Sequence, residues 1–379
     1  MKVLHVFTII NTPRSFFDGQ FKYLSDHGQE IHIATDSPED IDFTKRNNIK
    51  YHRIAISRSI SPFTDLKTIG ALSRLIKKEK FDVVVGHTPK GAMVAMIAAK
   101  LTGVKTRIYY RHGYIYTTAK GMKRRLLKVI ERITANWSSK VVNVSPSIGE
   151  IAIVDKLNPA KKQLVIGAGT CCGIDTVNSF NPVLVPEAEK KALKESLGIV
   201  ENDFVVGFCG RLCKDKGIPE LIDGFKAYNL SNPSAKLLLV GPYDSRDILA
   251  EKYRTEINEN PNIVATGKVD KEKLPLYYSI MNLFVLPSHR EGFGMCVLEA
   301  SAMEVPILVS RAHGCVDSIV EGKTGKYIDI SPKDIVRGLE SYKLIANYGT
   351  AGRKWVKENF ERTNMWPKLL EFYNSLTEV

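Results

Sequence analysis

Two glutamates flank a glycine-containing stretch late in the chain, within HREGFGMCVLEASAMEVP (289–306). Glu291 and Glu299 stand eight positions apart, and Gly292 and Gly294 between them let the backbone approach a ligand closely. Carboxylates accept hydrogen bonds from paired sugar hydroxyls, whereas the N–H groups at a helix start suit a phosphate. The stretch therefore predicts one acid on a hexose and one on a ribose, with a diphosphate between them. The alternative is a capping acid and a second glutamate that makes a structural bond at the edge of the core.

A second candidate motif is GRLCKDKG (210–217). It places Arg211 directly after an expected strand and Lys216 near the start of the next expected helix. Cations and backbone N–H groups that converge at a helix N-terminus form a natural clamp for a diphosphate. Gly210 and Gly217 favour this interpretation over its alternative, a pair of solvated surface cations.

Short apolar runs alternate with helical patterns along the whole chain. The first series of expected strands covers 2–9, 30–36, 81–87, 105–112 and 138–145, with helical spacing at 16–28 and 62–80. The second series covers 203–211, 235–241, 262–267, 281–288 and 305–310. Alternation of this kind is typical of doubly wound parallel sheets, and two series predict two domains.

The two motifs fall where such a fold binds ligands. In doubly wound sheets the ligand lies outside the carboxyl ends of the strands. Residues 210–217 follow one expected strand directly, and residues 288–294 follow another. We expect Glu291 in this second loop and Glu299 inside a helix over 295–303. A segment rich in proline, asparagine and charge, 178–195, is expected to link the two domains.

Together these motifs resemble those of a known family. EGFGMCVLE resembles the E-x7-E motif of retaining glycosyltransferases of the GT-B fold, glycosyltransferase family 4, and GRLCKDKG resembles that family's arginine–lysine diphosphate motif. GIDTVNSFNP (173–182) is similar to its interdomain segment. The resemblance covers essentially the whole chain. It implies an α/β GT-B fold of two Rossmann-like, doubly wound domains that face a central cleft.

The resemblance also implies domain roles and site residues. Residues 1–180 would bind the acceptor, residues 181–361 would bind the nucleotide sugar, and a helix at about 362–379 would pack back on the first domain. Catalytic roles would fall to four residues, His112, Glu291, Arg211 and Lys216. Substrate contacts are implied for Gly19, Arg211, Lys216, Glu291, Gly292, Phe293, Gly294, Met295 and Glu299.

Each of these roles follows the family pattern. Glu291 would contact the donor sugar and Glu299 the ribose, while Arg211 and Lys216 would neutralise the leaving diphosphate. The backbone at 293–295 would touch sugar and phosphate, and Gly19 would lie near the phosphates.

His112 matches the family's histidine near the reacting sugar. The alternative for His112 is a satisfied core histidine at the end of a buried strand, although Gly113 at the same strand exit favours function. His87, in GHTPKG, is expected either in the core or on the acceptor side.

The charge of the chain predicts an anionic partner. The net charge is +13 and the isoelectric point about 9.3. No nucleic-acid motif accompanies this charge, so phosphorylated substrates and an anionic membrane surface fit better. Residues 120–137 predict an amphipathic helix. Its apolar face consists of Met122, Leu126, Val129, Ile130 and Ile133. Its basic face consists of Lys123, Arg124, Lys128 and Arg132. Its apolar face is expected in the core, with or without lipid docking of the basic face.

The resemblance, together with these observations, implies a retaining, metal-independent glycosyltransferase without a cofactor. It would move a hexose or N-acetylhexosamine from a nucleotide diphosphate sugar to a polyprenyl-diphosphate-linked saccharide in surface polysaccharide assembly. A UDP-sugar is the first donor to be expected. Metal independence is expected because no acidic cluster of the DxD type follows a strand. The opening MKVLHVFTII predicts a first strand and no signal peptide, so a cytoplasmic protein, peripheral on the inner membrane face, is expected. Two alternatives remain, a sugar-nucleotide epimerase of the same architecture and a non-catalytic nucleotide-sugar binding protein.

Overall fold

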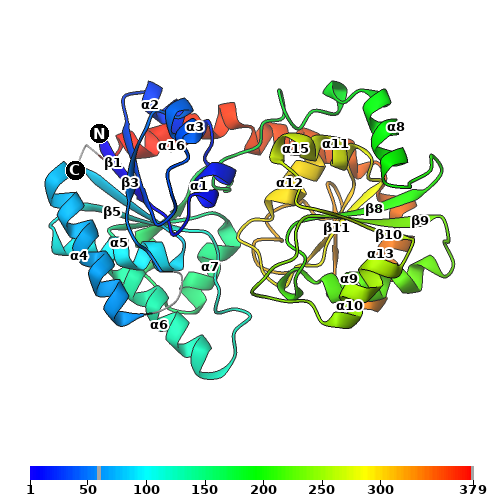
Figure 1. The fold of residues 1–379 in the computed structure, drawn as a ribbon, viewed down its shortest axis with the longest axis horizontal. Coiled ribbons are helices and arrows are strands. Elements are labelled where there is room, and N and C mark those ends of the chain that lie inside the picture. The colour runs from blue at the N-terminus through cyan, green and yellow to red at the C-terminus, as the bar shows by residue number, and fades with distance from the viewer. Residues whose placement is uncertain (58–60, 377–379) are drawn as a thin grey trace. The chain divides into compact units, whose positions relative to one another are not determined.

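The computed structural model describes residues 1–57 and 61–376 and divides into two α/β units (Figure 1). Unit 1 comprises Met1–Gly173 and the segment that begins at Arg362, and unit 2 comprises Ile174–Glu361. Residues 174–180, assigned above to the first domain, lie in unit 2, because the Ile174 N–H donates to the Phe360 carbonyl at 2.7 Å. The C-terminal helix α16 (Arg362–Asn374) belongs to unit 1 and packs on α2. The last residues of that expected helix, 377–379, lie outside the described part of the chain.

Unit 1 is built on a seven-stranded sheet in the order β3-β2-β1-β4-β5-β6-β7, and every neighbouring pair is parallel. The strands are β1 (Lys2–Val6), β2 (Glu30–Thr35), β3 (Ile49–Arg53), β4 (Val83–His87), β5 (Thr106–Arg111), β6 (Lys140–Asn143) and β7 (Gln163–Val165). Both faces of the sheet are buried. Alternate residues of one strand enter opposite cores, as Val3 and Leu4 of β1 do. This double burial explains why the strands appear in the sequence as continuous apolar runs.

Unit 2 repeats the plan with a six-stranded parallel sheet in the order β10-β9-β8-β11-β12-β13. Its strands are β8 (Phe204–Cys209), β9 (Ala235–Val240), β10 (Ile263–Gly267), β11 (Leu283–Leu286), β12 (Ile307–Ser310) and β13 (Lys326–Ile328). The predicted GT-B fold class is confirmed by these two sheets. β3, β7 and β13 are absent from the predicted series, because each lies at a sheet edge and is short or of mixed polarity.

Helices connect the strands, since parallel neighbours need crossovers (Figure 1). In unit 1 they are α1 (Asn11–Phe16), α2 (Gln20–Asp26), α3 (Ile41–Arg46), α4 (Pro62–Glu79), α5 (Pro89–Leu101), α6 (Gly121–Trp137) and α7 (Pro146–Val154), besides α16. In unit 2 they are α8 (Glu187–Ser196), α9 (Ile218–Asn229), α10 (Glu251–Glu259), α11 (Leu274–Ser279), α12 (Met295–Ala302), α13 (Pro332–Glu340), α14 (Tyr342–Ile345) and α15 (Tyr348–Phe360). No helix within the described residues is both long and apolar enough to cross a bilayer.

Helix α6 departs from its prediction. Most of its expected apolar face is exposed rather than packed in the core, namely Met122, Leu126, Val129 and Ile133. The face toward the sheet instead buries Glu131, Thr134 and Ala135. Glu131 lies there because the Tyr109 hydroxyl donates to it at 2.9 Å and Arg111 lies 3.5 Å from its carboxylate. A buried ion pair thus holds α6 to the sheet and leaves its apolar face open.

Candidate active site

The predicted diphosphate motif and the predicted acidic motif meet at the carboxyl edge of the unit 2 sheet. Residues 210–217 follow β8 and residues 287–294 follow β11, which is the neighbour of β8. Gly217 sits at the contact between the two loops with a φ of 70°. A Cβ at this position would lie 2.0 Å from the Pro287 carbonyl oxygen, so glycine is required for the loops to touch.

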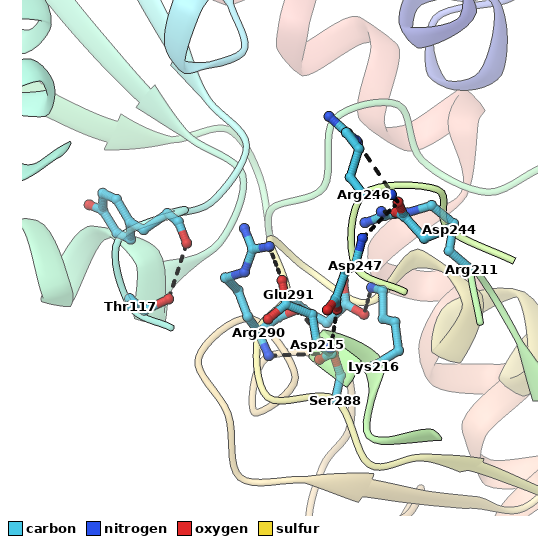
Figure 2. A network of polar contacts seen from close by, with 11 residues as sticks. Thr117, Arg211, Asp215, Lys216, Asp244, Arg246, Asp247, Ser288, Arg290 and Glu291 are labelled. Carbon is cyan, nitrogen blue, oxygen red and sulfur yellow. Dashed lines mark hydrogen bonds and ion pairs between the residues drawn. The ribbon is translucent and has the colours of Figure 1, made fainter. Parts of the chain in front are cut away.

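Three contacts to Asp215 fasten the second loop to the first, and Figure 2 shows those made by Ser288 and Arg290. The His289 N–H donates to the Asp215 carbonyl at 2.9 Å, and the Ser288 hydroxyl donates to the same oxygen at 3.1 Å. The Arg290 guanidinium forms an ion pair with the Asp215 carboxylate. Asp215 and Arg290 thus preorganise the loop that carries Glu291. Neither was predicted as a site residue. The only feature of the sequence that points to them is that each lies next to a predicted site residue.

Lys216 and Glu291 form an ion pair at this junction (Figure 2). The side chains are only 16% and 12% exposed. Burial by itself lowers the pKa of Lys216, but the Glu291 carboxylate outweighs it and the pKa of Lys216 is raised. The lysine is therefore charged at neutral pH although little water reaches it. The structure brings these two predicted residues into direct contact.

Arg211 has a different partner, the Asp244 carboxylate. The Asp244 side chain is 4% exposed, while that of Arg211 is 45% exposed. Asp244 also accepts hydrogen bonds from the backbone N–H groups of Arg246 at 2.7 Å and Asp247 at 3.3 Å. Asp247 in turn accepts from the Asp215 N–H at 2.7 Å, so one polar network joins Arg211 to the Lys216 loop (Figure 2). Asp244 was not predicted, although it follows a strand in the segment GPYD.

Helix α12 begins directly after this loop, at Met295. Gly294 occupies the N-cap position with a φ of 78°, and no side chain caps the helix. The first N–H groups of the helix are therefore not occupied by a cap and point along its positive end. Phe293 is 3% exposed and packs against Phe360, so only its backbone is available to a ligand. Gly292 lies beside it, half-buried, in the same loop.

Glu299 lies inside α12 and makes a structural bond. The Tyr278 hydroxyl donates to its Oε2 at 2.9 Å. Burial raises the pKa of Glu299, against the opposing effects of Lys271 and Tyr278. Its other oxygen, Oε1, makes no hydrogen bond within the described residues and is not sealed from solvent. The structural alternative is thus realised at one oxygen, which leaves the second available to a ribose hydroxyl.

The two site residues predicted in unit 1 have different surroundings. His112 follows β5 and is half-buried, and its Nε2 lies 3.0 Å from Nδ1 of His87. Burial lowers the pKa of His112 to about 4, so this imidazole is neutral at physiological pH. Gly19 precedes α2 with a φ of 78°, and its N–H already donates to Asn47 Oδ1 at 2.8 Å. The positive φ together with a Cβ position 3.1 Å from the Trp366 ring favours glycine here without any ligand.

Metal ligands do not cluster in the described part of the chain. No group of three or more His, Cys, Asp or Glu side chains within it is close enough to hold a metal ion. No disulfide bond joins the six cysteines, all of which lie in the described part of the chain. The charged groups of the unit 2 site are therefore the side chains and helix N-terminus described above.

Comparison with known proteins defines the class. The family profile described as "Glycosyl transferases group 1" matches residues 189–355, and "Glycosyl transferase 4-like" matches residues 5–145. The chain is 31% identical to the capsular polysaccharide biosynthesis glycosyltransferase CapM of Staphylococcus aureus, over 99% of this chain and 98% of that protein. The chain therefore belongs to the GT-B glycosyltransferases of the family 4 type, as its motifs predicted.

A further relative and two solved structures agree with this assignment. The UDP-Gal:alpha-D-GlcNAc-diphosphoundecaprenol alpha-1,3-galactosyltransferase of Escherichia coli is 29% identical over 68% of this chain and 65% of that protein. A glycosyltransferase from Rickettsia africae superposes with a TM-score of 0.80 at 19% identity, over 99% of this chain and 98% of that one. Anabaena Alr3699/HepE in complex with UDP-glucose superposes with a TM-score of 0.78 at 18% identity, over 99% of this chain and 100% of that one. At these identities the two structures show a shared fold.

Proposed function

We propose that this glycosyltransferase moves a hexose or N-acetylhexosamine from a UDP-sugar to a lipid-linked saccharide in capsule or other surface polysaccharide assembly, with retention of configuration. Unit 2 binds the nucleotide sugar and unit 1 the acceptor. The observation that carries the proposal is the buried Lys216–Glu291 pair beside the uncapped start of α12. A buried ion pair adds little net stability, so a binding or catalytic use explains it better than folding does.

The charges of the unit 2 site suit a departing nucleoside diphosphate. Negative charge accumulates on the diphosphate as the bond from the anomeric carbon to the phosphate oxygen breaks. Lys216, the exposed end of Arg211 and the first N–H groups of α12 supply positive charge that is already in place. Removing one preorganised group of this kind typically costs about 3 kcal/mol of transition-state stabilisation. No metal ion is needed on this proposal.

Retention follows from attack on the face that the diphosphate leaves. Glu291 is paired with Lys216, so its carboxylate is better suited to hold a sugar hydroxyl than to attack the anomeric carbon. The acceptor oxygen then forms the new bond on the leaving-group face. Its proton passes to the departing phosphate oxygen, and the sugar keeps its anomeric configuration.

Relatives supply the donor and acceptor classes. The E. coli relative is named for UDP-galactose and a diphosphoundecaprenol-linked N-acetylglucosamine, and the Anabaena protein was solved with UDP-glucose. The S. aureus relative is named for capsular polysaccharide biosynthesis. We infer the same chemistry here, a UDP-linked donor and a polyprenyl-diphosphate-linked acceptor.

The test begins with binding and ends with product. A panel of UDP-, GDP-, ADP- and dTDP-sugars is screened for protection against thermal unfolding, and we expect a UDP-sugar to protect best. The protecting sugar is then incubated with undecaprenyl-diphosphate-linked acceptors, with and without a chelator. Free UDP that appears only with acceptor, and a product with the donor's anomeric configuration by NMR, support the proposal.

Other products identify the alternatives. Interconverted UDP-hexosamines without acceptor would indicate an epimerase, and binding without any turnover would indicate a carrier protein. An inverted anomeric centre would contradict retention, and complete loss of transfer with chelator would contradict the metal-free mechanism.

We also propose that α6 docks the enzyme on the inner face of the membrane. Met122 is 83% exposed and Leu126 50% exposed, and the exposed cations of residues 123–125 lie between them in the sequence. Exposed apolar side chains flanked by cations bind the interface of anionic bilayers. Lys128 and Arg132 contribute less, because they bind Asp155 and the carbonyls of residues 155–156.

Vesicle sedimentation tests the docking. We expect Met122→Ser/Leu126→Ser to reduce binding to phosphatidylglycerol vesicles at least fivefold while leaving binding of the UDP-sugar unchanged. The matched control is Val183→Ser/Leu184→Ser, which alters exposed apolar residues of unit 2. Equal binding by both double variants would contradict this assignment.

A further inference from the structure

Three histidines form a hydrogen-bonded chain across the unit 1 sheet. Nδ1 of His5 lies 2.9 Å from Nε2 of His87, and Nδ1 of His87 lies 3.0 Å from Nε2 of His112. Register explains the alignment. His5 pairs with Val85 and His87 pairs with Tyr110, so each histidine lies two residues beyond the partner of the one before. Residues two apart on a strand share a face, and the chain therefore runs diagonally to the carboxyl edge of the sheet.

Aromatic rings pack around this chain and exclude water from its two inner members, His5 and His87. The rings that pack on it within 4.1–6.4 Å are those of Phe7, Phe17, Phe21, Tyr110 and Tyr373. His5 and His87 are fully buried and His112 is half-buried. Burial lowers the pKa of His5 to about 3 and holds the pKa of His87 well below its usual value, with further lowering from its two histidine neighbours. All three imidazoles are therefore neutral.

Neutral imidazoles in such a chain have coupled tautomers. Each ring carries one proton, so each donates one hydrogen bond and accepts one. The protons are then either all on Nδ1, directed from His5 toward His112, or all on Nε2, directed the opposite way. The tautomer of His112 is thus set by the whole chain and not by His112 alone.

The inner end of the chain favours one direction. Nε2 of His5 is buried and has no hydrogen-bond partner among the described residues. With protons on Nε2, this atom would be a buried donor without an acceptor. With protons on Nδ1, it is only an unused acceptor, which proteins tolerate more often than an orphaned N–H. The outer end of the chain favours neither direction of the protons, because Nδ1 of His112 makes no hydrogen bond within the described residues and is open to solvent or ligand.

We propose that His5 and His87 are positioning residues that hold His112 as the neutral tautomer with its proton on Nδ1, so that His112 donates a hydrogen bond to a saccharide oxygen bound at the carboxyl edge of the unit 1 sheet. This inference rests on the proposed function for the identity of the ligand. His112 is then a fixed donor and not a general base, which agrees with a reaction in which the leaving phosphate takes the acceptor's proton.

The tautomer is measured directly on the full chain. Long-range 1H–15N NMR of the histidine-labelled protein distinguishes a protonated Nδ1 from a protonated Nε2, and the signals lost in His112→Gln assign that ring. We expect a neutral His112 with its proton on Nδ1. A proton on Nε2, or a doubly protonated ring at neutral pH, overturns the proposal. This measurement needs no substrate, so absence of transfer activity would reject the proposed function without touching this result.

Two substitutions at position 87 separate hydrogen bonding from packing. His87→Phe fills the aromatic site but cannot donate to His112, whereas His87→Asn leaves a gap but places an amide N–H near the position of Nδ1. We expect kcat to fall roughly five- to tenfold in His87→Phe, with KM changed less, and to recover largely in His87→Asn. Equal activity of the two, or higher activity with phenylalanine, would show a packing role only and overturn the proposal.

The matched control is a second histidine pair of the same sheet. Nδ1 of His32 lies 2.8 Å from Nε2 of His52, and their rings stack at 5.1 Å on β2 and β3. His52→Phe removes a bond of the same kind outside the His5–His87–His112 chain. We expect it to leave kcat and the His112 tautomer unchanged. An effect on the His112 tautomer as large as that of His87→Phe would overturn the assignment to this chain.

Discussion

The two units share a fold, yet the carboxyl edges of their sheets carry opposite chemistry. In unit 1 the edge residue His112 ends a chain of neutral imidazoles enclosed by aromatic rings. In unit 2 the corresponding edge carries full charges, held in the Lys216–Glu291 and Asp215–Arg290 pairs. The doubly wound fold therefore fixes where a site lies, while the side chains at the strand ends decide what it binds.

Burial has opposite consequences at the two edges because the partners differ. Each histidine of the His5–His87–His112 chain has only neutral histidine partners, so burial lowers its pKa and the ring loses its charge. Lys216 has the Glu291 carboxylate, so its pKa is raised in spite of burial. One edge thus offers neutral hydrogen bonds, which suit hydroxyl groups, and the other offers charge, which suits a diphosphate.

The largest expected effect comes from removing the charge of unit 2. Lys216→Ala should lower kcat at least tenfold, because the lysine acts on charge that develops in the transition state. It should also destabilise unit 2 by roughly 3 kcal/mol, because Glu291 is left nearly buried without its partner. Steady-state kinetics and urea unfolding measure the two effects separately.

Lys214→Ala is the control for that variant. Lys214 belongs to the same loop but is exposed. We expect its kinetics and its unfolding midpoint to match those of the unsubstituted protein. A loss of activity in Lys214→Ala as large as in Lys216→Ala would mean that the edge acts through general positive charge and not through the Glu291-paired lysine.

A smaller loss is expected at the exposed cation of the same edge. Arg211→Ala should lower kcat about tenfold, because in the proposed mechanism Arg211 acts on the leaving group. The loss of stability should be smaller than for Lys216→Ala, because the buried Asp244 carboxylate keeps the hydrogen bonds from the N–H groups of Arg246 and Asp247. Arg246→Ala is the matched control, since Arg246 also lies near Asp244, at 3.9 Å, and is 67% exposed. Equal kinetics for the two variants would contradict the diphosphate assignment of Arg211.

Most of the fold could be predicted from the sequence. The strands of both sheets are buried on two faces, and they therefore appear as apolar runs, such as Val83–His87 and Ala235–Val240. The edge strand Ile49–Arg53 was not predicted, because none of its residues is fully buried and its pattern is mixed. The burial of α6 was predicted wrongly, because the pair of Arg111 and Glu131 decides its inner face and the apolar stripe does not.

In the candidate site, the residues that could be predicted are those that belong to a short motif of neighbouring residues. Lys216 and Glu291 each stand in a recognisable motif after a strand, and the structure joins them. Their supporting residues could not be inferred, because Asp244 and Tyr278 act through contacts between loops and helices that are distant along the chain. The histidine chain of unit 1 was missed for the same reason. Its members lie on β1, at the end of β4 and just after β5, and only the register of those strands aligns them.

The neutral histidines of unit 1 should make the free energy of unfolding fall as the pH is lowered. The pKa of His5 is lowered by burial to about 3, against roughly 6.5 in an unfolded chain. Between these values the unfolded state binds a proton that the folded state does not. The stability from His5 is therefore complete above about pH 6.5 and declines as the pH falls toward 3, by about 1.4 kcal/mol per pH unit.

His5→Phe removes this contribution. Urea unfolding at several pH values should give a shallower loss of stability between pH 6.5 and 4.5 for His5→Phe than for the unsubstituted protein. The exposed His313 of unit 2 provides the control substitution His313→Phe, for which an unchanged slope is expected. Identical slopes for all three proteins would mean that His5 is charged in the folded state, and the contrast between the edges would fail.

The smallest effect is expected where the charged edge of unit 2 touches a neutral group. Tyr278→Phe removes the 2.9 Å hydrogen bond that holds Oε2 of Glu299, while the ring remains in its buried site. If Glu299 binds the ribose through Oε1, the freed carboxylate loses orientation, and KM for the nucleotide sugar should rise about threefold with kcat little changed. Glu299→Gln keeps an acceptor at this position and should give a rise of similar size. A fall in kcat without a change in KM in either variant would contradict ribose binding by Glu299. It would instead assign Glu299 to the chemical step, together with the charged residues of the same edge.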